Sequence, residues 1–281
     1  MKKQYFIHFL LLVLLSNIFL PVQKQVLAAE SEIVFSTQIY KEISGTQLNA
    51  HILSPVDVQA NEKRPVFVFF HGGGWTQGSP QQWVDPCRLI TPKGWVIILF
   101  QYRLCTNDAI TPVDCIKDAK SAIRWVRANA DKLHVDPDKI VASGESAGGH
   151  LAASTAMITG INEYSDNLTI SSEPNALVLF YPCLNTDADN WFKKLLHNQI
   201  PIEQTSPFHQ IRKGLPPTVI FHGTKDEIVP YSTIVEFQEK MNRFGNDCTL
   251  HTFENRGHGL SQNDVPEISR LTTEFLKGLG W

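Results

Sequence analysis

The stretch KIVASGESAGGHLAA, residues 139–153, places a serine between small residues directly after a short apolar run. Gly144, Ser146 and Gly148 form the pattern Gly-x-Ser-x-Gly. A tight turn from a strand into a helix needs small neighbours of this kind when it lifts a serine hydroxyl out of the fold as a nucleophile. Glycine and serine are also frequent in ordinary turns, so the pattern has to be judged together with the rest of the chain.

Strand-like and helix-like segments alternate along the chain. Dense apolar runs such as PVFVFF (65–70) and GWVIILFQY (94–102) are typical of strands buried on both faces of a sheet. The predicted strands are 33–43, 47–55, 65–70, 94–102, 139–145, 176–182, 217–223 and 248–253, the first two forming an antiparallel pair. The predicted helices are 114–133, 150–158, 232–245 and 265–280. This alternation predicts an α/β fold with a mostly parallel, doubly wound sheet and helices on both faces.

Four of the predicted strands end in residues suited to one kind of chemistry. The tract HGGGW (71–75) follows the strand at 65–70, and its consecutive glycines leave backbone N–H groups open to a developing oxyanion. Ser146, Asp226 and His258 follow three later strands, in that order along the chain. Because such sheets place their chemistry at the carboxyl ends of the strands, we expect these side chains to meet. The order Ser, Asp, His on an α/β sheet is the arrangement of an α/β-hydrolase.

Two other acids compete with Asp226 for its position. Asp187 and Asp189 follow the strand at 176–182 and could also orient a histidine. We favour Asp226, because GTKDEIVP (223–230) places it immediately after a strand. The HGGGW tract has a rival interpretation as a phosphate loop, but no Gly-Lys-Ser/Thr follows it.

The base has to be chosen among ten histidines. His71 and His222 lie at strand ends and are expected to be structural, and His251 lies inside a strand. His258 follows the last strand in a loop, with glycine on both sides. We therefore expect His258 to be the base.

With these motifs, the chain resembles a known family. It is similar to the alpha/beta hydrolase fold-3 and hormone-sensitive-lipase-like esterases, above all to small bacterial esterases called BD-FAE-like or acetyl-esterase-like, over roughly residues 45–278. The likeness is carried by HGGGW (71–75), YRL (102–104), Pro112, Asp118, Ala122, RW (124–125), DPDKI (136–140) and GESAGGHLA (144–152). Two features depart from the family. Glu145 stands where aspartate is frequent, and the long N-terminal cap of hormone-sensitive-lipase relatives is missing.

The resemblance implies a serine carboxylesterase for short, acetyl-type esters, with acetylated carbohydrate as a candidate substrate. It makes Ser146 the nucleophile, His258 the general base and Asp226 the acid that orients it. The oxyanion hole would be formed by the backbone N–H groups of Gly73, Gly74 and Ala147. This chemistry needs no cofactor and no metal.

The substrate site is expected to involve the one sizeable insertion, at about residues 183–216, as a small lid over the acyl side of Ser146. Trp75, Trp191 and Phe192 are the candidate substrate-binding residues. The expected partner is a small-molecule or carbohydrate ester, and short acyl chains should be preferred because so small a lid offers little apolar wall. The sequence does not indicate an oligomeric state.

Two other functions remain open at this point. One is a serine peptidase related to prolyl oligopeptidases, which share the order Ser, Asp, His. Against it, HGGGW is an esterase-type tract, and no propeller domain precedes the catalytic segment. The other is a non-catalytic binding protein on the same fold, although no member of the triad is missing here.

Residues 1–28 have the pattern of a signal peptide, with two lysines, a long apolar run and small residues at Val26, Ala28 and Ala29. An uncleaved N-terminal anchor is the alternative. After cleavage, residues 29–281 would form a single catalytic domain, secreted or periplasmic and not inserted in the membrane. The formal charge of −3 would become about −6, because the leader carries three lysines and no acid, so nucleic acid is an unsuitable partner.

Five cysteines follow the leader: Cys87, Cys105, Cys115, Cys183 and Cys248. An oxidising compartment allows at most two pairs and leaves one thiol over. Cys105 and Cys115 flank a single loop and are the expected disulfide. No CxxC occurs among them, which argues against a zinc site.

Overall fold

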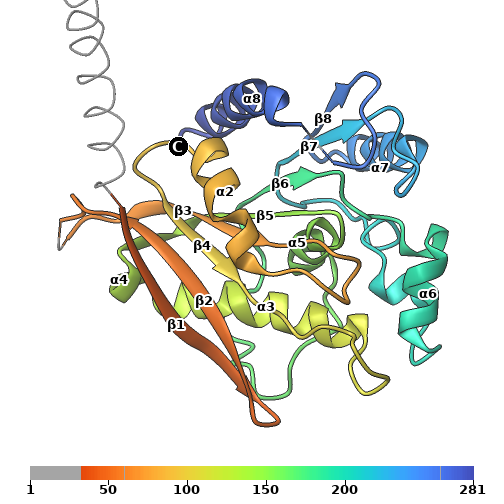
Figure 1. Ribbon diagram of the computed structural model, residues 1–281, viewed down its shortest axis with the longest axis horizontal. Helices are drawn as coiled ribbons and strands as arrows, with labels where there is room; N and C mark the ends of the chain where they lie inside the picture. The colour runs from red at the N-terminus through yellow and green to blue at the C-terminus, as the bar shows by residue number, and fades with distance from the viewer. Residues whose placement is uncertain (1–32, 60, 260) are drawn as a thin grey trace, which may run out of the picture.

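The structure of the protein is a computed structural model that describes residues 33–59, 61–259 and 261–281. Within these residues one eight-stranded sheet forms the centre, in the order β1-β2-β4-β3-β5-β6-β7-β8 (Figure 1). The strands are β1 (Ile33–Ile43), β2 (Thr46–Pro55), β3 (Arg64–Phe70), β4 (Val96–Phe100), β5 (Val135–Glu145), β6 (Ala176–Phe180), β7 (Thr218–Gly223) and β8 (Cys248–Phe253). β2 pairs antiparallel with β1 and β4, and all other neighbours are parallel. The predicted α/β-hydrolase fold is confirmed.

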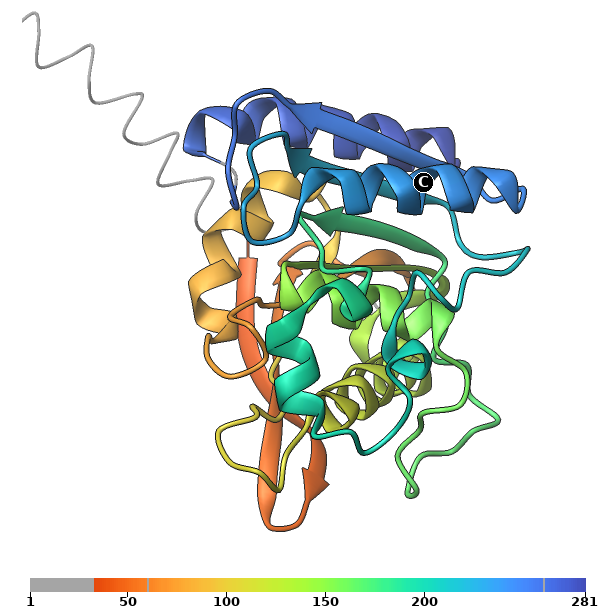
Figure 2. The same ribbon diagram turned by 90° about the vertical axis from the view of Figure 1, so that its right-hand side faces the viewer.

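Helices cover both faces of the sheet (Figures 1 and 2). They are α2 (Val84–Ile90), α3 (Pro112–Ala128), α4 (Ala130–Leu133), α5 (Ala147–Met157), α6 (Asn190–Leu196), α7 (Tyr231–Arg243) and α8 (Val265–Gly278). Short 3-10 turns lie at Pro80–Trp83, Thr186–Ala188, Ile202–Thr205 and Gln262–Asp264. Helix α2 is not anticipated from the sequence, because seven residues are too few for a helical period to stand out.

Alternate side chains of the central strands supply two hydrophobic cores. Val66, Val68 and Phe70 of β3 belong to the core beneath α3, α5 and α7. Phe67 and Phe69 belong to the core beneath α2 and α8. All five side chains are fully buried. A strand sends successive side chains to opposite faces, so an unbroken apolar run serves a sheet covered on both sides.

The helix predicted at 114–133 is two helices in the structure. α3 begins at Pro112, where Thr111 and Asp114 form a capping box and proline occupies the first turn. It ends at Ala128, and the short α4 follows after Asn129. The capping residues therefore indicate where these helices begin and end more accurately than the spacing of the apolar residues does.

The strand order brings the two decisive loops together. β3 and β5 are direct neighbours, and their register pairs Phe70 with Gly144. The tract that follows Phe70 and the turn that contains Ser146 therefore leave the sheet side by side. β7 and β8 lie two and three strands beyond β5, so their carboxyl ends lie at the same edge of the sheet.

None of the described helices is long and apolar enough to cross a bilayer. The predicted signal peptide at residues 1–28 lies outside the described part of the chain.

The predicted disulfide between Cys105 and Cys115 is absent from the structure. The two Sγ atoms lie 3.7 Å apart, and all five cysteines are free and buried. The Cys115 thiol donates a hydrogen bond to the backbone oxygen of Arg103 at 3.1 Å, so it already has a polar partner. The short loop does bring the two cysteines together, as predicted, but as thiols.

Candidate active site

Ser146 lies at a sharp turn between the end of β5 and the start of α5. Its φ of 52° and ψ of −117° are unusual for a residue with a side chain. A Cβ at Gly144 would overlap the backbone of Gly148, and a Cβ at Gly148 would overlap the carbonyl oxygen of Phe70. The pattern Gly-x-Ser-x-Gly thus has a steric cause, because only glycine allows β5, α5 and the end of β3 to approach so closely.

The structure brings Ser146, His258 and Asp226 together from three different loops. The Ser146 hydroxyl donates to Nε2 of His258 at 2.9 Å. Nδ1 of His258 donates to Oδ2 of Asp226 at 2.8 Å. The Asp226 carboxylate is completely buried, whereas the His258 side chain keeps 17% of its surface exposed. A nucleophile, a base and an acid are therefore linked in the geometry of a serine-hydrolase triad.

Asp226 is held as a carboxylate by several donors. Its Oδ1 accepts the backbone N–H groups of Ile228 at 2.9 Å and Val229 at 2.8 Å. Its Oδ2 lies 3.2 Å from Nε2 of His222 as well as beside His258. Burial by itself would raise the pKa of Asp226, but the hydrogen bonds from His222, His258 and Val229 outweigh it and lower the pKa well below its usual value. Asp226 is therefore ionised at neutral pH.

The competing acids have other partners. Asp189 caps the N-terminus of α6 and accepts the backbone N–H groups of Trp191 and Phe192. Asp187 forms an ion pair with Lys193 at 3.1 Å. Neither contacts His258, so the choice of Asp226 from the sequence agrees with the geometry.

The HGGGW tract leaves β3 in a conformation that favours glycine. Gly73 and Gly74 have φ values of 110° and 58°. Among the described residues, no hydrogen-bond acceptor is recorded for the backbone N–H groups of Gly73, Gly74 or Ala147. Ala147 is the first residue of α5, where N–H groups have no partner within the helix. These three N–H groups therefore remain candidate donors to an oxyanion.

His71 is structural, as the sequence analysis expected. Burial lowers its pKa to about 4, so its ring is neutral. Nδ1 of His71 donates to the carbonyl oxygen of Gly72 at 2.7 Å, and the ring stacks on Tyr102 with a centroid separation of 4.4 Å. The Tyr102 hydroxyl donates to the carbonyl oxygen of His71 at 2.8 Å. The start of the tract is therefore fixed by the segment that follows β4.

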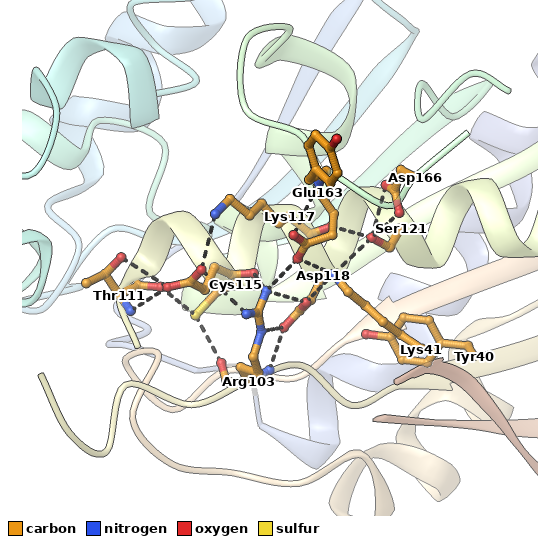
Figure 3. A network of polar contacts seen from close by, with 12 residues as sticks. Tyr40, Lys41, Arg103, Thr111, Cys115, Lys117, Asp118, Ser121, Glu163 and Asp166 are labelled. Atoms are coloured by element: carbon orange, nitrogen blue, oxygen red, sulfur yellow. Dashed lines mark hydrogen bonds and ion pairs between the residues drawn. The ribbon is translucent and has the colours of Figure 1, made fainter. Parts of the chain in front are cut away.

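A buried ionic network anchors that segment in turn (Figure 3). Asp118 of α3 is completely buried and accepts from Nε and Nη2 of Arg103, each at 2.8 Å, and from Nζ of Lys41 at 2.6 Å. Glu163 accepts from Lys41 at 2.9 Å and from Arg103 at 3.1 Å. Arg103 directly follows Tyr102, so the network positions Tyr102 against the HGGGW tract.

Two of the three predicted substrate-binding residues lie in the interior. Trp75 is 2% exposed and Phe192 is fully buried, with ring centroids 4.8 Å apart. Nε1 of Trp75 donates to Nδ1 of His150 at 3.2 Å. The prediction that Trp75 and Phe192 line the substrate site is corrected accordingly, because these apolar rings pack the core beneath the tract.

Trp191 differs from its neighbour Phe192. It is 45% exposed, and its Nε1 donates to the carbonyl oxygen of Gly74 at 3.0 Å. This bond joins α6, the helix of the predicted lid insertion, to the HGGGW tract. Trp191 therefore remains a candidate substrate-binding residue.

Three residues that surround the triad were given no role in the site from the sequence. His222 contacts Asp226, although it was expected to be merely structural. Burial and the charge of Glu145 raise the pKa of Tyr181, and the Tyr181 ring lies edge-on to the His258 ring with centroids 4.9 Å apart. The signal for Glu145 was its place directly before Ser146, and the signals for Tyr181 and His222 were their places at strand ends.

Residues 52–241 match the family described as BD-FAE. The chain belongs to the BD-FAE family. Its fold is that of an α/β-hydrolase, in agreement with the resemblance that the motifs indicated. The match includes Ser146 and Asp226 and ends before His258.

Several relatives and solved structures to which the chain is similar are esterases. Esterase LipC of Mycobacterium tuberculosis is 28% identical over 63% of this chain and 48% of its own length. The probable carboxylic ester hydrolase LipM of the same species is 26% identical over 78% of this chain and 56% of its own length. The apo form of Thermogutta terrifontis esterase 2 superposes with a TM-score of 0.82 and 40% identity, covering 88% of this chain and 95% of that chain. The chain is therefore similar to esterases both in sequence and in fold.

The chain spans about half the length of these two Mycobacterium relatives. The likeness therefore concerns only the matched part of those relatives. In contrast, it spans nearly the whole of the Thermogutta esterase.

Proposed function

We propose that the protein is an exported serine carboxylesterase that hydrolyses short-chain acyl esters, with acetylated carbohydrate as a candidate natural substrate. The observation that carries this proposal is the continuous chain of hydrogen bonds from Ser146 through His258 to Asp226. Free backbone N–H groups beside it supply the second requirement of acyl transfer, a site for negative charge.

In the proposed reaction, the Ser146 oxygen attacks the carbonyl carbon of the ester. Its proton passes to Nε2 of His258, and Asp226 stabilises the imidazolium that forms. The carbonyl electron pair moves onto oxygen, where N–H groups of Gly73, Gly74 and Ala147 bind the oxyanion. Loss of one such donor typically costs ~3 kcal/mol in the transition state.

Collapse of this intermediate expels the alcohol. The imidazolium of His258 gives its proton to the leaving oxygen, and the acyl group stays on Ser146 as an ester. A water molecule then attacks the acyl carbon while His258 takes the water proton. The second oxyanion collapses, the carboxylic acid leaves, and the proton returns to Ser146.

The preference for short acyl chains rests on the size of the lid. The insertion contributes the seven-residue α6 and two short 3-10 turns. Phe192 and Leu196 of α6 point into the core, so they offer no wall to a long chain. Thermogutta terrifontis esterase 2, which is about 40% identical to this chain, has been solved with propionate and with butyrate bound. These short carboxylates bound to a similar esterase support the proposed preference for short acyl chains.

A covalent probe gives the most direct test of the nucleophile. The same relative has been solved phosphorylated by paraoxon. We expect paraoxon to add one phosphoryl group to this protein, at Ser146, and to abolish turnover of p-nitrophenyl acetate. Modification at another residue would contradict the role of Ser146 as nucleophile. Turnover of an aminoacyl nitroanilide in preference to the ester would contradict the proposed esterase and favour the peptidase alternative.

Export is proposed on the pattern of residues 1–28 alone. N-terminal sequencing of the protein recovered from outside the cytoplasm should begin near Ala29. A mature protein that still begins at Met1 would contradict cleavage.

A further inference from the structure

Helix α6 of the insertion contacts the HGGGW tract through two consecutive side chains. Nε1 of Trp191 donates to the carbonyl oxygen of Gly74 at 3.0 Å. The Phe192 ring packs edge-on against the Trp75 ring, with centroids 4.8 Å apart and an interplanar angle of 78°. Neighbouring residues of α6 therefore hold neighbouring residues of the tract, one by a hydrogen bond and one by apolar packing.

The position of α6 is fixed by its own contacts. Asp189 caps its N-terminus and accepts the backbone N–H groups of Trp191 at 2.8 Å and of Phe192 at 3.0 Å. Phe192 is fully buried, and Leu195 and Leu196 also belong to the core. The cap and the buried side chains stabilise a seven-residue helix that is too short to be stable alone. The indole of Trp191 is thus held on a fixed helix.

Gly74 depends on contacts from outside to keep its conformation. Its φ is 58°, and glycine populates this region and others about equally readily. The carbonyl oxygen of Gly73 accepts the backbone N–H groups of Thr76 at 3.2 Å and of Gln77 at 3.1 Å, which fixes the peptide unit that carries the Gly74 N–H. The next peptide unit carries the Gly74 carbonyl, which accepts from Trp191. Because each peptide unit is planar, holding both units leaves neither torsion angle of Gly74 free.

We propose that Trp191 is a positioning residue of the reaction: its indole N–H holds the Gly74 carbonyl and thereby keeps the Gly74 N–H directed at the oxyanion. This inference rests on the proposed esterase function. Donors to an oxyanion are most effective when they already point to the place where the charge develops. Helix α6 then acts as a clamp on the oxyanion tract, and not only as part of a lid.

A clamp on the tract and a wall for the substrate have different kinetic effects. A wall contacts the substrate in the ground state and in the transition state alike, so its loss raises KM. A clamp serves the oxyanion, which is absent from the ground state, so its loss lowers kcat. The Trp191 ring is 45% exposed and is able to serve as a wall, whereas its N–H serves the clamp. A replacement that keeps an aromatic ring and removes the N–H separates the two.

The test is therefore Trp191→Phe. The matched control is Trp281→Phe, the same replacement where the indole packs against Trp95 with ring centroids 6.1 Å apart. For Trp191→Phe we expect kcat for p-nitrophenyl acetate to fall about fivefold, the effect of one hydrogen bond, with KM within about twofold. Acylation and deacylation both pass through an oxyanion, so kcat falls whichever step limits turnover. For Trp281→Phe we expect kcat and KM within about twofold of the wild type.

A trifluoromethyl ketone measures stabilisation of the oxyanion separately from turnover. The Ser146 oxygen bonds to its carbonyl carbon, the Ser146 proton passes to His258, and the carbonyl electron pair remains on oxygen. The affinity for this inhibitor should fall about fivefold in Trp191→Phe and change less than about twofold in Trp281→Phe. If kcat and this affinity both stay within about twofold of the wild type in Trp191→Phe, or if only KM rises, the inference is overturned.

NMR relaxation of the Gly74 backbone amide tests the clamp without any ligand. The order parameter should be about 0.85 in the wild type, typical of rigid backbone, and should fall toward ~0.6 in Trp191→Phe. An order parameter that stays within ~0.05 of the wild type would overturn the inference. A wild type that lacks ester turnover would refute the proposed function, and the Gly74 amide would still decide whether Trp191 holds the tract.

Discussion

Replacement of Asp118 by asparagine removes the central charge of the network that anchors Arg103 and Lys41. The carboxylate has no exposed surface and is paired with both cations at 2.6–2.8 Å. Removal of one partner from a buried pair costs 3–5 kcal/mol, because a buried charge is left uncompensated. Glu163 also pairs with both cations, so we expect the lower end, about 3 kcal/mol in the free energy of unfolding.

Equilibrium urea unfolding measures this loss, with Tm as a second reading. A loss of about 3 kcal/mol corresponds to a fall in Tm of roughly 9 °C for a chain of this size. The control is Asp85→Asn, since Asp85 pairs with Arg88 at 3.5 Å but its side chain is 83% exposed. That variant should lose less than about 1 kcal/mol. If Asp118→Asn stays within about 1 kcal/mol of the wild type, the network does not stabilise the fold as argued.

Three further predictions concern activity. Ser146→Ala and His258→Ala should each remove nearly all esterase turnover without loss of fold. The double variant should lose no more turnover than either single variant, because the two residues act as a unit. More than about a hundredth of wild-type turnover in Ser146→Ala would disprove the triad. In a p-nitrophenyl ester series from C2 to C16, short chains should be hydrolysed best, because each unburied CH₂ forgoes about 0.8 kcal/mol of binding; a maximum at C10 or longer would mean a larger acyl site. Across pH, kcat/KM should fall on the acid side, because His258 must be unprotonated to accept the proton of Ser146, and a rate that stays flat down to about pH 4 would exclude His258 as the base.

The residues that approach the triad could be inferred only in part from the sequence. Ser146, Asp226 and His258 were identifiable because each follows a strand, and the carboxyl ends of parallel strands share one edge of a sheet. His222 was assigned a structural role, yet it contacts Asp226. A strand-end position says which edge a residue reaches, but not which neighbouring strand its side chain faces.

The three aromatic candidates show the same limit of prediction from the sequence. Trp75, Trp191 and Phe192 were equal candidates for the substrate site, since all three lie next to expected site loops. In the structure Phe192 and Trp75 are buried against each other and Trp191 is exposed. Adjacent residues of a helix differ by about 100° in direction, so the docking of α6 decides which one enters the core.

The α/β class, the order of strands and helices and the place of each motif after a strand could be predicted from the amino-acid sequence, because these depend on local periodicity and turn chemistry. The contacts between distant segments became known only from the folded chain: Glu145 with Gly72, Asp118 with Lys41, and the thiols of Cys105 and Cys115 as an unbonded pair. Such contacts depend on strand order, register and the packing of helices, which bring together residues far apart in the chain. Local sequence patterns do not specify that arrangement, so the charged groups around His258 could be identified only in the folded chain.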